Sequence, residues 1–326
     1  MSTTAHSPTT VLIVSPALAS ANNGNWQTAS RWARMLRDDC GTTVVAAWTG
    51  QRCDALIALH ARRSADSICA FAQAHPDRPC IVVLTGTDLY RDIRSDPAAQ
   101  TSLQVATHLV VLQDQGPAEL DAALRRKTHV IYQSAPPLRP VPAPKRHLRA
   151  LFVGHLRDEK DPLTFLRAAE RLRGRYDIRF ELIGSALDPA LGLAVQRVQS
   201  QCPTVRWLGA LPHAATRQHI KRAQLLVNSS RMEGGAQVIL EAAQSGTAVL
   251  ASRVPGNVGM LGPQHVGLFD SGDDVALARL VERARDDALF LDLLRAQTRQ
   301  RAPLFDPAAE QRSLRQLITT ALESSR

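Results

Sequence analysis

Short runs of consecutive apolar residues alternate along the whole chain with longer stretches of helical periodicity. Because the apolar character is continuous rather than alternating, these runs predict strands covered on both faces, as in parallel sheets. Helical patterns such as LTFLRAAERLR (residues 163–173) and residues 237–245 separate them, which is typical of strand–helix–strand units. The predicted strands are residues 11–15, 43–48, 55–59, 81–85, 109–112, 130–132, 151–154, 180–184, 205–208, 225–228, 249–251 and 267–269.

A proline-rich segment, SAPPLRPVPAPKRH (residues 134–147), interrupts this alternation. Its prolines exclude a helix or a central strand and favour a stiff extended linker. We therefore predict an α/β chain with two Rossmann-like, doubly wound domains facing a cleft, residues 1–147 including the linker and residues 148–326, with the last helix a candidate to pack back on the first domain. Ligands of such sheets bind outside the carboxyl ends of the strands, so function is expected there.

The composition is that of an ordinary globular protein, with 44% hydrophobic and 21% charged residues among 326. No apolar stretch approaches the ~18 residues that span a bilayer. The N-terminal MSTTAHSPTT has neither a basic nor an apolar signal region, and the five cysteines form no CxxC pair. These features predict a cytoplasmic protein without stable membrane insertion, a disulfide framework or a zinc ribbon.

A formal net charge of +9 is compatible with nucleic-acid binding. The charge is spread along the chain, however, and only 4% of the residues are aromatic, which leaves few platforms for stacking bases. Only four of the 39 basic residues are lysines, so part of the charge reflects a compositional bias. We expect small anionic ligands and no nucleic-acid partner, and keep a basic nucleic-acid-binding protein as the non-enzymatic alternative.

The segment SRMEGGAQVILEAAQSG (residues 230–246) carries the clearest chemical signal. A predicted strand leads into a loop with Glu233, Gly234 and Gly235, and a helix with Glu241 follows. The glycines let backbone N–H groups approach an anion, and the helix N-terminus adds a positive dipole end. Glu241 lies about two helical turns beyond Glu233. Its carboxylate is placed to accept hydrogen bonds from ribose hydroxyls while Glu233 contacts a sugar. The alternative is a structural role, in which the glycines form the turn before a helix and the glutamate interacts favourably with the helix dipole.

The segment LFVGHLRDEK (residues 151–160) is the second signal. A predicted strand ends in Gly154, and Arg157 and Lys160 lie at the start of the helix that follows. A fork-shaped guanidinium and a compact ammonium together match a diphosphate. We interpret this loop as a phosphate site, the alternative being a solvated charge cluster that includes the two acidic residues between Arg157 and Lys160.

Together the two segments resemble the retaining glycosyltransferases of family 4, which have the GT-B fold. Glu233 and Glu241 are similar to the family's E-x7-E element, and FVGHLRDEKDPLTFLRA is similar to its FVGRL-x2-EKG segment. The resemblance implies that Arg157 and Lys160 bind the donor diphosphate, Glu241 the nucleotide ribose and Glu233 the donor sugar.

Two departures from the family pattern leave the donor sugar open. Asp161 stands where the family has glycine, and Gly235-Ala236 stands where it commonly has Phe-Gly.

The N-terminal half narrows the resemblance. The phrases ANNGNWQTA, DALIALHARRSADSI, VVLTGTDLYRDI and HLVVLQ, with the SRMEGG variant, are similar to the selenosugar synthases of selenoneine biosynthesis, a compact branch of the same fold. That family joins selenophosphate to the anomeric carbon of a UDP-sugar and releases UDP and phosphate, which implies UDP-N-acetylglucosamine or UDP-glucose as donor here. A family 4 glycosyltransferase acting on an envelope lipid or saccharide is the alternative.

Polar residues after the N-terminal strands are candidates for the acceptor side. His60 lies at a strand end, where family members often place a donor-contacting histidine; a capping or packing histidine is the alternative. An anionic acceptor needs positive charge, which Arg62 and Arg63, or Arg91, would supply, although adjacent arginines are more often solvated. Asp88 either orients a sugar hydroxyl or caps the next helix.

We expect a glycine-containing loop at Asn23, Gly24 and Asn25 that contacts the donor phosphate or the acceptor. The alternative is that these residues only make the loop flexible.

The proposed catalytic set is Glu233, His60, Arg157 and Lys160. Selenophosphate is an anion with a polarizable nucleophilic atom, so it needs no strong general base. The sequence has no metal-ligand spacing and no DxD motif, which predicts a metal-independent reaction with a UDP-sugar co-substrate and no cofactor. The two cations and backbone N–H groups then stabilise the leaving UDP.

Overall fold

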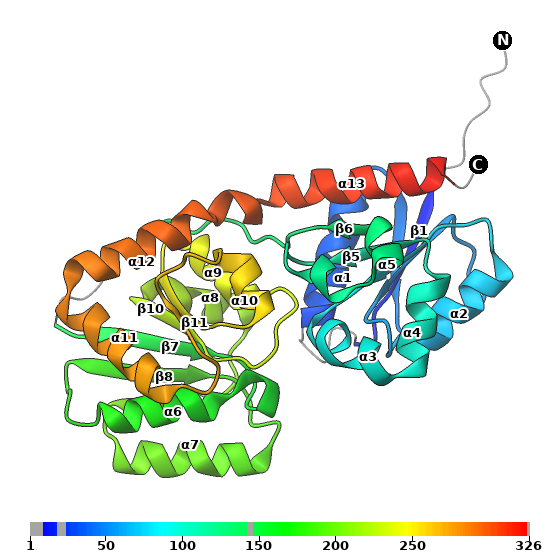
Figure 1. The fold of residues 1–326 in the computed structure, drawn as a ribbon. Helices are drawn as coiled ribbons and strands as arrows, with labels where there is room; N and C mark the ends of the chain where they lie inside the picture. The colour runs from blue at the N-terminus through cyan, green and yellow to red at the C-terminus, as the bar shows by residue number, and fades with distance from the viewer. Residues whose placement is uncertain (1–8, 18–23, 142–145, 325–326) are drawn as a thin grey trace. The chain divides into compact units, whose positions relative to one another are not determined.

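The structure is a computed structural model that describes residues 9–17, 24–141 and 146–324 (Figure 1). Contacts divide these residues into two compact units. One contains the described residues up to Gln133 together with those from Pro307 onward, and the other is Ser134–Asp306. Their assignment as an acceptor-side domain and a sugar-nucleotide-binding domain stays a prediction.

The described part of the first unit forms a six-stranded parallel sheet with the order β2-β1-β3-β4-β5-β6, which confirms the parallel sheet that the apolar runs predict. Every residue of β3 is buried, as expected for a strand covered on both faces. The order reverses between β1 and β3, so the ligand-binding edge is expected beside them. The strands are β1 (Thr10–Val14), β2 (Gly41–Val45), β3 (Ala55–Leu59), β4 (Cys80–Val83), β5 (His108–Val111) and β6 (Thr128–Val130).

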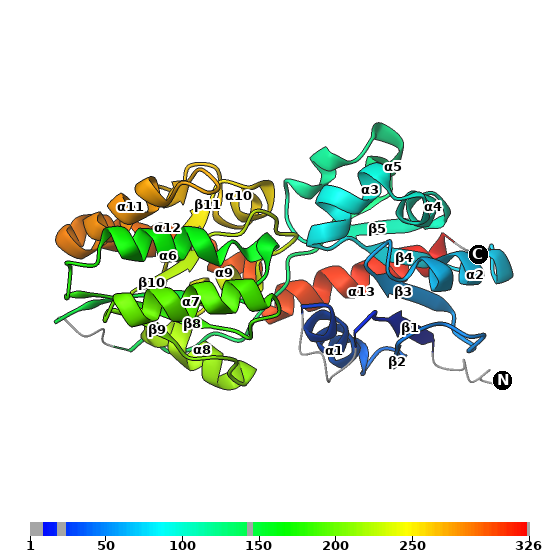
Figure 2. The same ribbon diagram turned by 90° about the horizontal axis from the view of Figure 1, so that it is seen from below.

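Helices cover both faces of this sheet. The helices α2 (Ala65–Ala74) and α4 (Pro97–Val105) bury apolar side chains on one face. On the other face lie α1 (Gly24–Leu36) and α13 (Pro307–Glu323), and Figure 2 shows α13 running alongside the strands. The short helices of the unit are α3 (Ile93–Ser95) and α5 (Ala122–Arg126).

The last helix is tied to α1 by one buried carboxylate. Glu310 accepts hydrogen bonds from Nε of Arg31 at 2.9 Å and from Nε1 of Trp32 at 2.7 Å. Its side chain is fully buried, so both donors are needed to offset its desolvation. This contact holds the end of the chain on the first unit.

The second unit also has a six-stranded parallel sheet in its described residues, with the order β12-β11-β10-β7-β8-β9. Counted from β7, this is the strand order of the dinucleotide-binding Rossmann fold, and it reverses between β7 and β10. The strands are β7 (Leu148–Val153), β8 (Ile178–Ile183), β9 (Val205–Trp207), β10 (Leu225–Asn228), β11 (Ala248–Ser252) and β12 (Leu268–Phe269).

Three aromatic rings in mutual contact lie in the core of this unit, with a tilted pair and an edge-to-face pair. The ring of Phe165 is 5.7 Å from that of Phe152 and 5.5 Å from that of Phe180. The surrounding helices are α6 (Pro162–Arg171), α7 (Pro189–Gln201), α8 (His213–Arg222), α9 (Gln237–Ala243), α10 (Pro255–Leu261), α11 (Asp274–Asp286) and α12 (Ala288–Gln300). Among all the described residues, no helix is both long and apolar enough to cross a membrane.

The start of α1 corrects one prediction. Gly24 and Asn25 belong to the first turn of this helix, not to a loop. The buried residues Thr28, Trp32 and Leu36 follow one another at four-residue spacing, and the Thr28 hydroxyl donates to the Gly24 carbonyl at 2.8 Å, which ties the exposed first turn to the buried part of the helix. Asn23, and residues 1–8 with the signal-peptide prediction, lie outside the described residues.

The described part of the proline-rich segment has neither helix nor strand, as predicted. It is held to the second unit by backbone hydrogen bonds. The N–H of Ala135 donates to the Phe305 carbonyl at 3.3 Å, and the N–H of Leu138 donates to the Gln244 carbonyl at 2.8 Å.

Candidate functional site

The sheet of the second unit brings the two sequence signals to one edge. The loop after β7 carries Gly154, Arg157 and Lys160, and the loop after β10 carries Glu233. Since β7 and β10 are parallel neighbours at the reversal of strand order, both loops emerge at the position where Rossmann-type sheets bind ligands.

An ion pair joins these loops. Nζ of Lys160 lies 2.6 Å from Oε1 of Glu233, whose carboxylate is buried. Burial alone would raise the pKa of Glu233, but the Lys160 ammonium and hydrogen bonds from Ser230 and Asn228 outweigh it and hold the pKa below its ordinary value. Glu233 is therefore ionised and fixed in place at neutral pH.

A buried polar network beneath Glu233 was missed by the sequence analysis. The Asn228 amide donates to Oδ1 of Asn257 at 3.3 Å, and the Asn257 amide donates to the Ser252 carbonyl at 3.0 Å. The hydroxyl of Ser230 lies 2.7 Å from Oε1 of Glu233. The sequence contained one indication of this network, because the polar residue Asn228 ends the otherwise apolar strand LLVN.

Two further glycines allow close backbone packing against these loops: Gly256 of α10 beside the loop after β10, and Gly184 after β8 beside the loop after β7. A Cβ on Gly256 would lie 1.8 Å from the Glu233 carbonyl oxygen, and one on Gly184 would lie 2.0 Å from that of Gly154. Gly184 also has a φ of +147°, which L side chains rarely adopt. Gly234 and Gly235 form the bend before α9 without positive φ.

The two cations of the β7 loop differ in their surroundings. The Arg157 side chain is 44% exposed, and its Nε lies 3.9 Å from the Glu159 carboxylate, a weak contact. Lys160 is drawn inward by Glu233 and is 21% exposed. The solvated-cluster interpretation fits Asp158, which faces Arg231 at 3.1 Å, but does not fit Lys160.

Asp161 has a left-handed backbone, with a φ of +43°. Glycine is the residue that adopts this conformation most readily, and the family pattern has glycine here. Asp161 compensates because its carboxylate accepts from the Thr164 N–H at 3.3 Å and the Thr164 hydroxyl at 2.7 Å, which caps α6. Asp161 therefore sustains a left-handed turn at this position without being glycine.

Glu241 is buried on α9 and contacts a residue that the sequence analysis did not single out. Nε2 of His213, the first residue of α8, lies 2.6 Å from Oε1 of Glu241. The Gln237 amide donates to the same oxygen at 3.3 Å. No sequence spacing links His213 to Glu241, because they lie on different helices.

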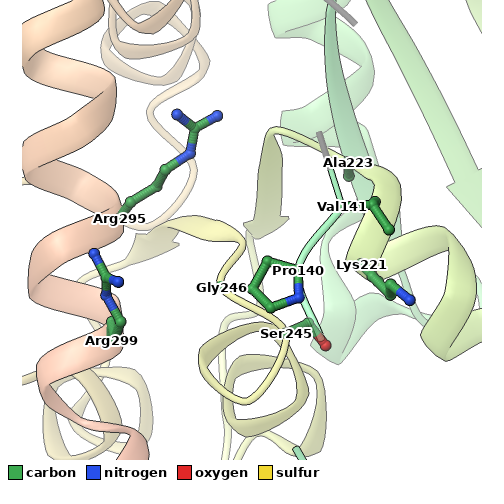
Figure 3. A pocket seen from close by; sticks show the side chains of 8 residues that line it. All are labelled: Pro140, Val141, Lys221, Ala223, Ser245, Gly246, Arg295 and Arg299. Atoms are coloured by element: carbon green, nitrogen blue, oxygen red, sulfur yellow. The ribbon is translucent and has the colours of Figure 1, made fainter. Parts of the chain in front are cut away.

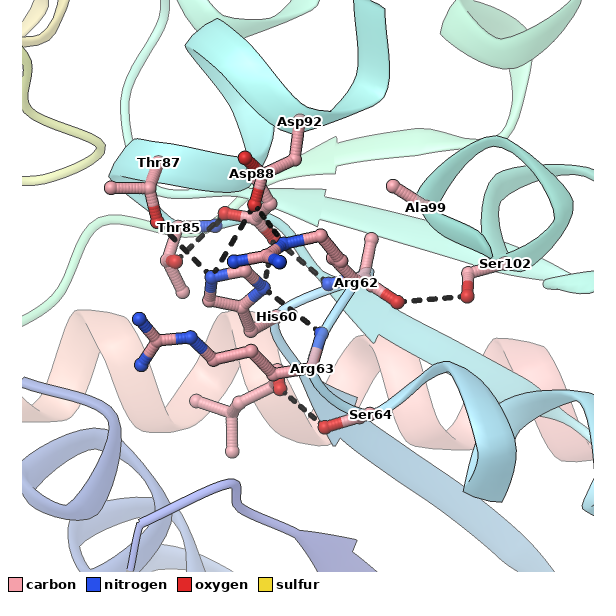
Figure 4. A network of polar contacts seen from close by, with 12 residues as sticks. His60, Arg62, Arg63, Ser64, Thr85, Thr87, Asp88, Asp92, Ala99 and Ser102 are labelled. Atoms are coloured by element: carbon pink, nitrogen blue, oxygen red, sulfur yellow. Dashed lines mark hydrogen bonds and ion pairs between the residues drawn. The ribbon is translucent and has the colours of Figure 1, made fainter. Parts of the chain in front are cut away.

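In the first unit, a polar cluster lies after β3 and β4 (Figure 4). Asp88 is fully buried, and its carboxylate accepts from the N–H groups of Ala61 at 2.9 Å and Thr85 at 2.7 Å. It therefore joins the two loops rather than capping the helical turn that follows. Its role toward a sugar hydroxyl stays a prediction.

His60 directly follows β3 with a φ of +74°, in the left-handed region, and is buried. The Arg63 N–H donates to Nδ1 at 3.4 Å, so Nε2 carries the proton and donates to the Thr87 hydroxyl at 3.1 Å. Burial lowers the pKa of His60, and the neighbouring Asp88 offsets this only in part. The ring is therefore neutral at pH 7.

The adjacent arginines have different surroundings. Nε of Arg62 donates to Asp92 at 2.8 Å, and Arg91 donates to the same carboxylate at 3.0 Å. Burial opposes ionisation of Asp92, but the two guanidiniums hold its pKa below the ordinary value. Arg63 has no ion pair among the described residues, and Figure 4 shows its guanidinium extending away from the network.

A separate pocket of about 290 Å³ lies in the second unit (Figure 3). Ala223 and Gly246 precede β10 and β11, so this pocket is at the amino ends of the strands, opposite the edge with Glu233. Its lining residues are Pro140, Val141, Lys221, Ala223, Ser245, Gly246, Arg295 and Arg299. In the described part of the chain, no group of three or more His, Cys, Asp or Glu side chains is arranged to hold a metal ion.

The segment with the ion pair matches a known family. Residues 147–287 match the family model described as "Glycosyl transferases group 1". Glycosyltransferase 1 domain-containing protein 1 of Xenopus tropicalis is 32% identical over 126 residues, which are 38% of this chain and 36% of that protein. The match thus spans little more than a third of this relative's length.

Solved structures match the chain over nearly its full length. Sucrose-phosphate synthase from Thermosynechococcus elongatus has a TM-score of 0.75 at 18% identity, covering 96% of this chain and 98% of that one. HepE of Anabaena, in complex with UDP and glucose, has a TM-score of 0.76 at 14% identity, covering 96% and 100%. A glycosyltransferase from Rickettsia africae has a TM-score of 0.74 at 13% identity, covering 97% and 99%.

These findings establish the fold and locate the family match. The chain has the GT-B fold of the glycosyltransferases, which confirms the predicted fold. Residues 147–287, which include Arg157, Lys160, Glu233 and Glu241, match the family model of the group 1 glycosyltransferases. The narrower resemblance to the selenosugar synthases stays a prediction.

Proposed function

We propose that the chain is a glycosyltransferase that joins the anomeric carbon of a UDP-sugar to the selenium of selenophosphate. The observation that supports the donor half most directly is the Lys160–Glu233 ion pair, with Arg157 in the same loop, at the reversal of strand order. These residues lie within the segment that matches the glycosyltransferase family. HepE of Anabaena, a structural neighbour, has been solved with UDP-glucose.

The donor diphosphate is assigned to Arg157 and Lys160. Charge develops on this group as its bond to the sugar breaks, and cations beside it stabilise that charge. Arg157 offers an exposed guanidinium with one weak contact, and Lys160 is 2.6 Å from Glu233. A diphosphate on Lys160 lies next to Glu233, and we therefore assign Glu233 to the donor sugar. The assignment of Glu241 to the ribose follows the resemblance to the family 4 glycosyltransferases.

The acceptor side is assigned to the cluster after β3 and β4. Arg63 is the arginine of that cluster with no ion pair among the described residues, whereas Arg62 is held by Asp92. His60 adopts a left-handed backbone while buried, and such strain in a non-glycine residue is concentrated at functional sites. Its neutral ring suits contact with a substrate more than charge pairing.

The reaction needs no oxidant or reductant. A selenium lone pair forms the bond to the anomeric carbon while the bond from that carbon to the diphosphate oxygen breaks, and UDP leaves with the electron pair. The product is a glycosyl selenophosphate. Water then cleaves its Se–P bond, giving the selenosugar and phosphate.

The test is UDP release from UDP-N-acetylglucosamine and UDP-glucose, with and without freshly made selenophosphate, with mass spectrometry of the products. We expect release only with selenophosphate, together with a selenium-bearing sugar, and the same rate in EDTA. UDP binding without turnover would overturn the assignment of selenophosphate as the acceptor and would leave the assignment of the donor site intact. Absence of UDP binding would overturn the donor site as well.

A further inference from the structure

The two carboxylate oxygens of Glu241 have different surroundings. Oε1 accepts from Nε2 of His213 at 2.6 Å and from the Gln237 amide at 3.3 Å. Within the described residues, no hydrogen bond reaches Oε2. The carboxylate is therefore held through one of its two oxygens.

His213 is placed for this contact by the fold. It begins α8, which follows β9, so it lies at the same carboxyl edge of the sheet as the loops after β7 and β10. Helices α8 and α9 are neighbours, and α9 carries Glu241 in its second turn. Since a carboxylate only accepts hydrogen bonds, Nε2 of His213 carries a proton.

We propose that His213 is a positioning residue for nucleotide recognition: it fixes Oε1 of Glu241 so that Oε2 points to a ribose hydroxyl. This inference rests on the proposed assignment of Glu241 to the ribose. The terminal torsion of a glutamate is broad, so a carboxylate without a fixed partner samples many orientations. Holding one oxygen in the free protein lowers the ordering cost when the nucleotide binds.

The experiment is calorimetric titration of the full chain with UDP and with 2′,3′-dideoxy-UDP, which lacks both ribose hydroxyls. His213→Ala should weaken UDP binding about tenfold, the size of one hydrogen bond to a charged group. The same substitution should leave dideoxy-UDP binding unchanged, because that probe has no hydroxyl for Glu241. His213→Gln, which keeps a donor, should recover most of the UDP affinity.

His219→Ala is the matched control. His219 is a second histidine of α8, but its Nδ1 faces Glu181 of β8 at 3.8 Å. Its removal should leave both affinities within about twofold of the wild type. Thermal unfolding of each variant identifies any that fail to fold. If His213→Ala does not fold, His213→Gln and His213→Asn replace it in the comparison of UDP and dideoxy-UDP binding.

The outcomes separate the two proposals. If His213→Ala weakened the binding of UDP and of dideoxy-UDP equally, the positioning role would be overturned. Unchanged binding of UDP would also overturn it. Wild-type protein that binds no UDP would instead overturn the donor site, and the inference would fall with it.

Discussion

The ammonium of Lys160 lies 2.6 Å from the carboxylate of Glu233, although the two residues are 73 positions apart in the chain. The pair joins the loops after two neighbouring strands and keeps a buried carboxylate ionised. It therefore links the stability of this unit to the charge arrangement that the proposed donor site needs.

Replacing Lys160 by methionine leaves Glu233 buried without its cation. Breaking a buried ion pair costs about 3–5 kcal/mol, and because Lys160 is 21% exposed we expect about 2–3 kcal/mol at pH 7. Urea unfolding measures the change. Lys221→Met is the matched control, since Lys221 forms no ion pair with any described residue, and an equal loss in both variants would contradict the prediction.

The same variant should change the pH dependence of stability. In the wild type the pKa of Glu233 is lowered, so its stabilising contribution is full above the unfolded pKa of about 4.3 and is lost as the pH falls through the folded pKa. In Lys160→Met the effect of burial on Glu233 is no longer outweighed by the ammonium. The pKa of Glu233 therefore rises in the folded state, and protonation of Glu233 favours folding. The difference in unfolding free energy between the proteins should therefore narrow as the pH is lowered toward about 4. A constant difference would contradict this.

Substitution of Arg157 by alanine tests the diphosphate assignment. We expect a higher KM for the UDP-sugar and a lower kcat, with kcat/KM reduced about 100-fold, because the interaction strengthens as charge develops on the leaving group. Steady-state kinetics with varied donor measure this. Arg197→Ala, an exposed arginine on α7, is the control and should match the wild type.

The two adjacent arginines of the first unit should behave differently. Arg63→Ala should raise the KM for selenophosphate about tenfold at saturating donor, because the guanidinium has no ion pair among the described residues and is available to an anion. Arg62→Ala should instead lower the unfolding temperature, because it leaves Asp92 with one fewer partner. Acceptor kinetics and thermal unfolding of both variants distinguish these effects; a raised KM only in Arg62→Ala would reverse the assignment.

Asp161 offers a test of the left-handed turn before α6. Asp161→Gly loses the cap but gains a residue suited to positive φ, so we expect a loss of less than about 1 kcal/mol. Asp161→Ala loses the cap and keeps the strain, so we expect about 2 kcal/mol. Denaturant unfolding measures both, and equal losses would show that the backbone conformation has no part in the effect.

Local pattern was enough to predict the strands. Residues 55–59 (ALIAL) form a buried strand because coverage on both faces requires consecutive apolar residues, and this requirement is visible in the sequence itself. The loops with Lys160 and Glu233 were found for a related reason, since parallel strands place the residues that follow them at one edge. The start of α1 was missed because Gly24 and Asn25 are typical turn residues and precede the buried positions of the helix, which begin at Thr28.

The partners of the charged residues were decided by tertiary structure. Arg62 and Arg63 are equivalent in sequence, and only the packing of the loops after β3 and β4 places Asp92 beside Arg62. His213 meets Glu241 because α8 and α9 are neighbours on one sheet. The sequence by itself determined the alternation of strands and helices and the edge where chemistry is expected, because burial and turn geometry act between near neighbours. Which charges are paired depends on contacts between distant segments, and these exist only once the sheet has formed.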